Sequence, residues 1–556
     1  MTKQMIFRCR GSRTVASFWL MGWMLALTSS LQAEENGSCA SCRGSTASQS
    51  LPILPTNGGG PEANLKEVHF SGVERVDPER LQALAADYLG RPISVAVLEE
   101  LAARVTALYH AQGYFLAQAL VPVQRVRDGR VEISVLEGRL GQVRIAIDAQ
   151  APIDEARVRG YLAALRPGEV LQADSYERAM LLLSDLPGIK VRSGLQQGVE
   201  TGTTDLLVEV TAAKRWNAVL DLNNHGNRET GRIRGGGSMR WASPAGIGDN
   251  LDVGLMMSED NGVNYGRLAY ELPLGSQGVR FGMGLSRVAY DQGGAFSSLD
   301  ANGTARIGEL TLSWPVLRQR NQNLILNARL DYKKLSDRLD EFDWTNDRNV
   351  RGLGAGWIWE RRDDWGGGGY WSSGGSLYYG NLRLEDSAPR AADRGPMGLH
   401  TEGDFFKLSV DAARLQSIAP NHSLYVSIGA QLASRNLDSS EKLALGGVRG
   451  VRAYATSELL VDEGWLANLE WRWTLNEQVT PYLFYDFGRG RRVHSAPSAN
   501  SKDNWDQLSA AGLGLSWGRP GDFMLNLSLA WRLTPKAETD GGDHRPRLFA
   551  QIQKQF

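Results

Sequence analysis

The sequence predicts two small α/β modules followed by a transmembrane antiparallel β-barrel. Three observations lead to this fold class. The chain ends in a short stretch where apolar and polar residues alternate, up to a terminal Phe556. The same alternation runs through residues 213–556, with charged residues between apolar ones, whereas helical periodicity is confined to the chain before Val210. A period of two is typical of strands, and charges between apolar positions suit a barrel with a wet interior.

A basic leader opens the chain, and we expect residues 1–33 to be a signal peptide that is removed from the mature protein. The apolar run from Ala16 to Leu27 is too short to cross a membrane as a helix. Leu31-Gln32-Ala33 offers a small-residue cleavage site. The basic residues of the leader are Lys3, Arg8, Arg10 and Arg13.

Residues 34–64 are rich in Ser, Gly and Pro, which predicts a linker. The linker holds Cys39 and Cys42, for which a local disulfide is the simplest interpretation in an oxidising compartment. Arg43 stands where a haem attachment site needs His, and a zinc site lacks further ligands nearby.

Composition narrows the classes of function. With 556 residues the chain is too long for one compact domain, and its net charge of -1 argues against a nucleic-acid partner. The seven histidines are scattered without a His-Glu-x-x-His pattern, and no Gly-rich phosphate loop ends in Lys-Ser/Thr. We therefore expect no enzymatic activity, no catalytic residues, no metal and no cofactor.

One order of elements, strand–helix–helix–strand–strand, occurs twice before the barrel. In the first copy, residues 65–140, Asp77 and Pro78 open a helix and a second helix ends at Gly113. The second copy covers residues 141–212. An internal duplication of this size indicates two small stacked modules.

Both modules resemble the ShlB-type polypeptide-transport-associated (POTRA) domain of the transporter partner in two-partner secretion, within the Omp85 superfamily. In the first module the matching residues are Gly90-Arg91-Pro92, Tyr109, Gly113-Tyr114, Val121-Pro122-Val123-Gln124, Asp128-Gly129 and Glu137-Gly138. In the second they are Tyr176-Glu177-Arg178, Leu182-Leu183, Leu186-Pro187-Gly188, Gly202 and Leu206. The resemblance implies periplasmic POTRA domains and an outer-membrane barrel of sixteen strands over residues 213–556. It also implies an N-terminal plug helix, which the helix breakers in residues 34–64 disfavour.

The last strand is read as the signal for membrane insertion. Its apolar face would meet lipid and its polar face the lumen. The apolar face carries Leu548, Ala550, Ile552 and Phe556, and the other carries Phe549, Gln551, Gln553 and Gln555. We expect Phe556 to be recognised by the barrel assembly machinery. Glycine- and Asp-rich stretches at 361–375 and 385–395 are predicted to be extracellular loops.

Two barrel motifs resemble the mechanistic core of the family. The run from Gly446 to Tyr454, with Val451 and Arg452, resembles the sixth extracellular loop, which folds back into the lumen in relatives. Phe484-Tyr485-Asp486-Phe487-Gly488 resembles the Phe-x-Asp-x-Gly strand motif, whose Asp faces the lumen. The resemblance implies that Arg452 pairs with Asp486 and locks the loop. Arg449 competes for this role, and Ala453 replaces the usual glycine.

Substrate capture is assigned to the first two modules, since an extended chain can add to an exposed sheet edge. The candidate edge is Phe115, Leu116, Ala117, Gln118 and Ala119.

The resemblance implies that the protein exports a large haemolysin- or adhesin-like exoprotein, which it recognises through the exoprotein's N-terminal secretion domain. Whether it also activates the exoprotein is left open. The alternatives are an Omp85-type factor that inserts other outer-membrane proteins, an outer-membrane enzyme and a passive porin. The sequence leaves open the identity of the exoprotein, the role of the two cysteines and the oligomeric state.

Overall fold

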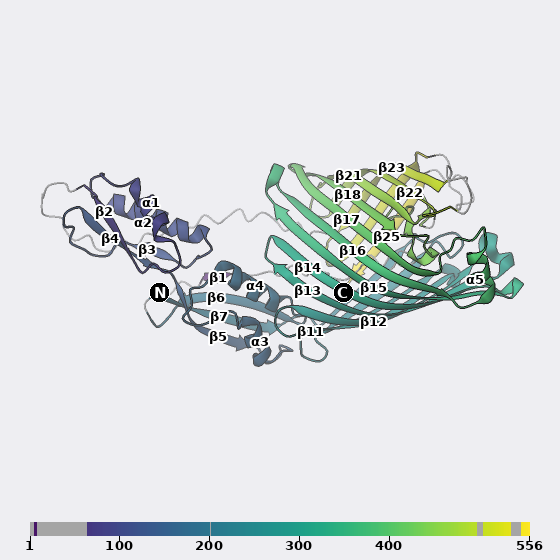
Figure 1. Cartoon of the computed structure of the whole chain (residues 1–556), viewed down its shortest axis with the longest axis horizontal. Helices are drawn as coiled ribbons and strands as arrows, with labels where there is room; N and C mark the ends of the chain where they lie inside the picture. Colours follow the sequence, from purple (N-terminus) through teal and green to yellow (C-terminus); the bar gives the residue numbers. More distant parts are fainter. Residues whose placement is uncertain (1–4, 8–63, 201, 457, 497–503, 535–545) are drawn as a thin grey trace.

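The computed structural model describes residues 5–7, 64–200, 202–456, 458–496, 504–534 and 546–556. The predicted cleavage site, residues 34–63 of the linker and the two cysteines lie outside these ranges. Two α/β modules lead into a long barrel, and the second module lies at one mouth of that barrel (Figure 1).

The first module packs two helices on a three-stranded sheet. Its elements are β2 (Glu67–Ser71), α1 (Pro78–Ala86), α2 (Val95–Ala111), β3 (Gln118–Leu120) and β4 (Arg130–Leu136). The sheet order is β2-β4-β3, with β2 parallel to β4. Both helices begin where a side chain caps the free backbone donors, Asp77 for α1 and Ser94 for α2.

Glu137, from the Glu-Gly motif, ties the first module together. Its Oε1 accepts hydrogen bonds from the Glu74 and Arg75 N–H groups at 2.7 and 2.8 Å, and from the Tyr109 hydroxyl at 2.9 Å. Burial raises the pKa of Tyr109 well above its usual range, and the bond to Glu137 adds to that rise. The tyrosine therefore stays a neutral donor.

The second module repeats the order of the first. Its elements are β5 (Arg139–Ile147), α3 (Glu155–Leu162), α4 (Ala173–Ser184), β6 (Ile189–Gln197) and β7 (Thr203–Ala212). In its sheet, β7 lies between β5 and β6, parallel to the first and antiparallel to the second. A short strand from the predicted signal peptide, β1 (Met5–Phe7), pairs antiparallel along the outer edge of β6.

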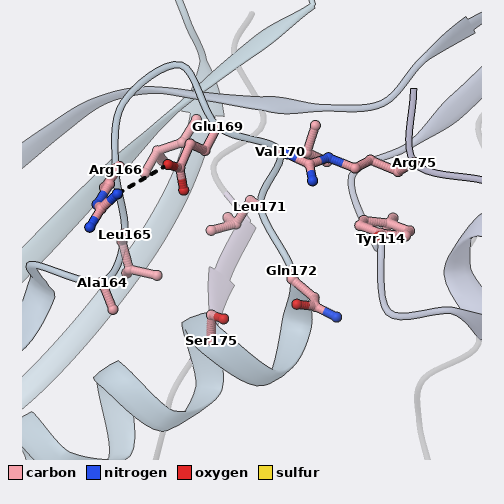
Figure 2. A pocket seen from close by; sticks show the side chains of 11 residues that line it. Arg75, Tyr114, Ala164, Leu165, Arg166, Glu169, Val170, Leu171, Gln172 and Ser175 are labelled. Atoms are coloured by element: carbon pink, nitrogen blue, oxygen red, sulfur yellow. Dashed lines mark ion pairs between the residues drawn. The ribbon is translucent and has the colours of Figure 1, made fainter. Parts of the chain in front are cut away.

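The modules meet through backbone contacts and one aromatic pair. Ala173 N–H donates to Gly113 O at 2.8 Å, and the rings of Phe115 and Tyr176 lie 5.8 Å apart. A polar cavity of about 160 Å³ opens at this junction, lined by residues of both modules, including Arg75 and Gln172 (Figure 2).

Sixteen antiparallel strands close into the barrel, as predicted. They are β8 (Trp216–Asn223), β9 (Arg234–Ala242), β10 (Asn250–Ser258), β11 (Val263–Leu274), β12 (Val279–Gln292), β13 (Ala301–Arg318), β14 (Gln322–Leu339), β15 (Trp344–Asp363), β16 (Gly369–Leu384), β17 (Gly403–Ala419), β18 (His422–Ala433), β21 (Glu463–Trp473), β22 (Val479–Arg491), β23 (Trp505–Gly518), β24 (Phe523–Arg532) and β25 (Arg547–Gln555).

Where the structure describes the connections, they carry short elements. They are η1 (Glu259–Asn261), η2 (Gly294–Leu299), η3 (Asp340–Phe342), η4 (Trp365–Gly367), α5 (Ser387–Arg394), η5 (Ser439–Glu441), β19 (Leu443–Ala444) and β20 (Leu460–Val461). No helix in the described part of the chain is long and apolar enough to cross a membrane.

One predicted extracellular loop, residues 361–375, is wrong. These residues form the end of β15, a turn at the module side, and the start of β16. Gly375 lies in β16 opposite Trp357, and a Cβ there would come within 2.2 Å of the Trp357 ring, so a glycine fits this strand position. The other stretch, residues 385–395, contains α5 at the end away from the modules (Figure 1).

The second module is fastened to the near rim of the barrel by polar contacts. Arg318 on β13 forms a bidentate pair with Asp185, with N···O distances of 2.8 and 2.7 Å. Arg178 donates to Pro315 O at 2.9 Å, and Ser243 Oγ donates to Pro152 O at 3.1 Å. Because the resemblance implies that these modules are periplasmic, we expect this rim to be the periplasmic mouth.

The terminal strand closes the barrel against β8. Leu548 and Ile552 are 52% and 39% exposed on the lipid face, whereas Phe549 and Gln551 are 2% and 5% exposed on the lumen face. The Phe556 N–H donates to Ala218 O at 2.8 Å, so the last residue continues the ladder of the seam.

We predict that deleting Phe556 lowers the amount of barrel in outer-membrane fractions, because the deletion removes both a seam hydrogen bond and the terminal aromatic. Immunoblots of those fractions measure the effect. Phe556→Tyr keeps an aromatic and should assemble normally. Normal abundance after the deletion would contradict the role of Phe556 as an insertion signal.

Candidate functional site

The segment between β18 and β21, residues 434–462, folds back into the barrel, and we call it the inner loop. Its Val451, Ala453 and Tyr454 side chains are fully buried. They pack with lumen-facing residues of three strands, among them Phe484 on β22 and Leu508 on β23. A connection at the outer end of two strands therefore has its own small core inside the lumen.

Arg452 of the inner loop makes a bidentate contact with Asp486 on β22. The Nη2–Oδ1 and Nε–Oδ2 distances are both 2.7 Å, and the Arg452 N–H donates to Oδ2 at 3.0 Å. Asp486 is fully buried. Of the two arginines that the sequence offers, Arg452 makes this bidentate contact.

Neighbouring strands complete the surroundings of the ion pair. Arg452 Nη1 donates to Glu470 Oε1 at 2.8 Å, and its guanidinium carbon lies 3.5 Å from the centre of the Phe484 ring. Asn468 Nδ2 donates to Asp486 Oδ1 at 2.8 Å. The guanidinium thus meets two carboxylates and an aromatic face, which satisfies a buried cation.

Glu470 and Asn468 were not predicted from the sequence, although the alternation of residues in β21 indicates that both face the lumen. Asn468, Glu470 and Arg472 alternate with Leu469 and Trp471 in β21, so they share the lumen face beside the motif strand.

The other motif residues shape the contact between the inner loop and the wall. A Cβ at Gly488 would lie 3.2 Å from Val451 Cγ2, so the glycine lets the loop pack closely on β22. Tyr454 donates its hydroxyl hydrogen to Thr534 O at 3.0 Å, and Arg532 Nε donates to Ala453 O at 2.9 Å. The loop is therefore held on β22 and β24 as well as at Arg452.

The predicted docking edge in the first module is wrong in extent and in exposure. Only Gln118 and Ala119 lie in β3, because Ala117 N–H closes a turn onto Tyr114 O. The edge is also covered by α2: Thr106 Oγ1 accepts from Ala119 N–H at 3.0 Å, and His110 Nε2 lies 3.0 Å from Ala117 O.

Phe115 and Leu116 hold the two modules together and are not part of a free edge. Both pack against the core of the second module, so they belong to the junction between the two modules. No group of three or more His, Cys, Asp or Glu side chains in the described residues is arranged to hold a metal ion.

Two family models match the chain. The haemolysin secretion/activation protein ShlB/FhaC/HecB model matches residues 202–517, and the ShlB-type POTRA domain model matches residues 63–138. The heme/hemopexin transporter protein HuxB of Haemophilus influenzae (strain 86-028NP) is 26% identical over 82% of this chain and 81% of its own length.

Outer membrane transporters named CdiB are also similar to the chain. The one from Escherichia coli O6:K15:H31 (strain 536 / UPEC) is 23% identical over 75% of this chain and 70% of its own length. A solved structure of CdiB from Escherichia coli superposes with a TM-score of 0.69 at 20% identity, covering 91% of this chain and 93% of the other. The fold is therefore the same.

Ala453 adopts a φ of +81°, a conformation in which a Cβ is strained. We predict that Ala453→Gly stabilises the folded barrel by about 1 kcal/mol. The temperature at which the folded band converts to the unfolded band on semi-native gels should rise. Ala455→Gly, where φ is not positive, is the matched control and should lower that temperature. An unchanged or lower temperature for Ala453→Gly would contradict the assigned strain.

Proposed function

The chain belongs to the haemolysin secretion/activation family ShlB/FhaC/HecB, and we propose that it captures and exports one large exoprotein across the outer membrane. In this proposal the modules hold the cargo's N-terminal secretion domain at the periplasmic mouth, and the barrel is the conduit. The observation that carries the proposal is the inner loop, which a buried ion pair holds inside a sixteen-stranded barrel. A channel that opens only for cargo needs such a removable obstruction.

We place cargo docking on the outer edge of β6. The Gly198 N–H donates to Thr203 O on β7, so the even-numbered residues of β6 bond to β7 and the odd-numbered ones point outward. The outward backbone groups include those of Ser193 and Leu195. An extended strand, β1, already pairs at these two positions. Removal of the signal peptide would free this edge for an extended segment of the cargo.

The edges of the first module are less suited to docking. α2 covers β3, and Gln82 Nε2 of α1 donates to Val68 O on β2 at 3.1 Å. Backbone pairing at β6 tolerates varied cargo sequences. Folding of the cargo outside the cell supplies the driving force for export, since the sequence has no nucleotide-binding loop. The relative named a heme/hemopexin transporter makes a haem- or hemopexin-binding exoprotein the first cargo to test.

Outer-membrane lipid and the barrel assembly machinery are two further partners in this proposal. Large apolar side chains are exposed along the strands, as contact with outer-membrane lipid requires. Among them are Trp314, Trp371, Trp471, Trp517 and Trp531. The terminal strand with Phe556 is assigned to recognition by the barrel assembly machinery.

We predict that Arg452→Ala sharply lowers secretion of the cargo while the barrel stays inserted and heat-modifiable. The substitution leaves Asp486 buried without its cation, whereas Glu470 keeps its contact with Arg472 at 2.7 Å. Breaking such a buried pair costs about 3–5 kcal/mol. Secreted cargo is measured at equal levels of transporter. The charge swap Arg452→Asp with Asp486→Arg should restore part of the export. Unchanged secretion by Arg452→Ala would contradict the lock.

We predict that Leu195→Pro weakens binding of the secretion domain by about tenfold or more, since proline removes an outward donor of the edge. Leu195→Ala is the matched control, because it removes the same side chain and keeps the N–H. Binding of a candidate exoprotein's N-terminal secretion domain to the purified full-length transporter gives the measurement. Circular dichroism checks that the proline variant is folded. Equal affinity of the proline and alanine variants would remove β6 as the docking edge.

A further inference from the structure

The first turn of the inner loop lies against a different part of the barrel from Arg452. Glu441, at the end of η5, is only 3% exposed. Its carboxylate lies 2.5 Å from Lys333 Nζ on β14 and 3.0 Å from Lys407 Nζ on β17. Its backbone oxygen accepts from Lys407 Nζ and from Gln431 Nε2, both at 3.2 Å. One loop residue thus joins three strands.

The charges around Glu441 form one connected cluster. Asp331 lies 3.8 Å from Lys333 Nζ and accepts from the Tyr378 hydroxyl at 2.9 Å. The ammonium groups of Lys333 and Lys407 lie 5.3 and 5.5 Å from the centre of the Tyr378 ring. Without the Glu441 carboxylate, the buried Lys333 and the half-buried Lys407 would lose the acid that lies within 3.0 Å of both. Asp331 cannot replace it, because it already pairs with Arg329 at 2.9 Å. Such an imbalance of buried charge is strongly unfavourable.

A second ion pair holds the same turn. Arg348 Nε on β15 lies 2.9 Å from Asp438 Oδ2, and Asp438 also caps the turn by accepting from Ser440 N–H at 3.0 Å. The start of the inner loop is therefore bound to β14 and β15 through the buried Lys333 and Arg348, and to β17 through the half-buried Lys407.

The Glu441 and Arg452 contacts of the inner loop lie on different parts of the barrel wall. In the strand order of the barrel, β14 to β17 precede β18, whereas β21 and β22, which bind Arg452, follow it. We infer that Glu441 is a second anchor of the inner loop. The loop is then a brace across the lumen, which leaves only when the contacts of Glu441 and those of Arg452 have both broken. Glu441 is a positioning residue in this account, which rests on the proposed function.

The test measures movement of the inner loop in the full-length protein, without cargo. Val451→Cys, with Cys39 and Cys42 replaced by serine, places one buried thiol on the loop. We expect Glu441→Gln to raise the rate at which maleimide labels this thiol in outer-membrane vesicles by at least about tenfold, because the loop loses one anchor. Arg452→Ala should also raise the rate, and the double variant should exceed either single one.

The control is Glu341→Gln, which makes the same chemical change on an exposed turn and should leave labelling at the wild-type rate. The pair Glu441→Gln with Lys333→Gln keeps the net charge of the lumen and should label quickly as well. Labelling at the control rate in both Glu441 variants would overturn the second anchor. Loss of folded barrel in both would also overturn it, since the cluster would then serve assembly. Fast labelling with normal export would contradict the proposed gating and leave the anchor standing.

Discussion

A guanidinium group buried among hydrocarbon and aromatic side chains needs carboxylates around it, because the free energy of leaving water is otherwise not recovered. Arg452 meets this requirement with Asp486 and Glu470, which lie on adjacent strands. Both acids are lumen-facing and can be reached only if the inner loop enters the barrel. This pairing sets where the Arg452 part of the loop lies, and with it the small core around Tyr454.

The same constraint connects the barrel to the modules. The bidentate pair between Arg318 and Asp185 fixes the second module at the periplasmic mouth. That module carries β6, the edge on which we place cargo. A chain held there lies beside the entrance of a lumen that the inner loop obstructs. In the proposed function, capture and opening are separate steps, and the ion pairs of the loop govern the second.

Alternation of side chains predicted the barrel because lipid and a wet lumen impose opposite polarity on the two faces of every strand. The inner loop was predicted through a motif, since Arg452 and Asp486 lie too far apart in the chain for periodicity to pair them. The covered edge at Ala119 and the glycine under Trp357 could not be read from the sequence. Both depend on which side chain from another element covers the backbone, and that is a property of the packed structure.

The most direct test of the account asks whether the inner loop must move for export. Val451→Cys and Gly488→Cys, with Cys39 and Cys42 replaced by serine, place two cysteines side by side, since Val451 Cγ2 lies 3.2 Å from a Cβ at position 488. We predict that export stops when a disulfide between them forms and returns when it is reduced, at constant levels of folded barrel. Export at the wild-type rate through a fully oxidised barrel would contradict it.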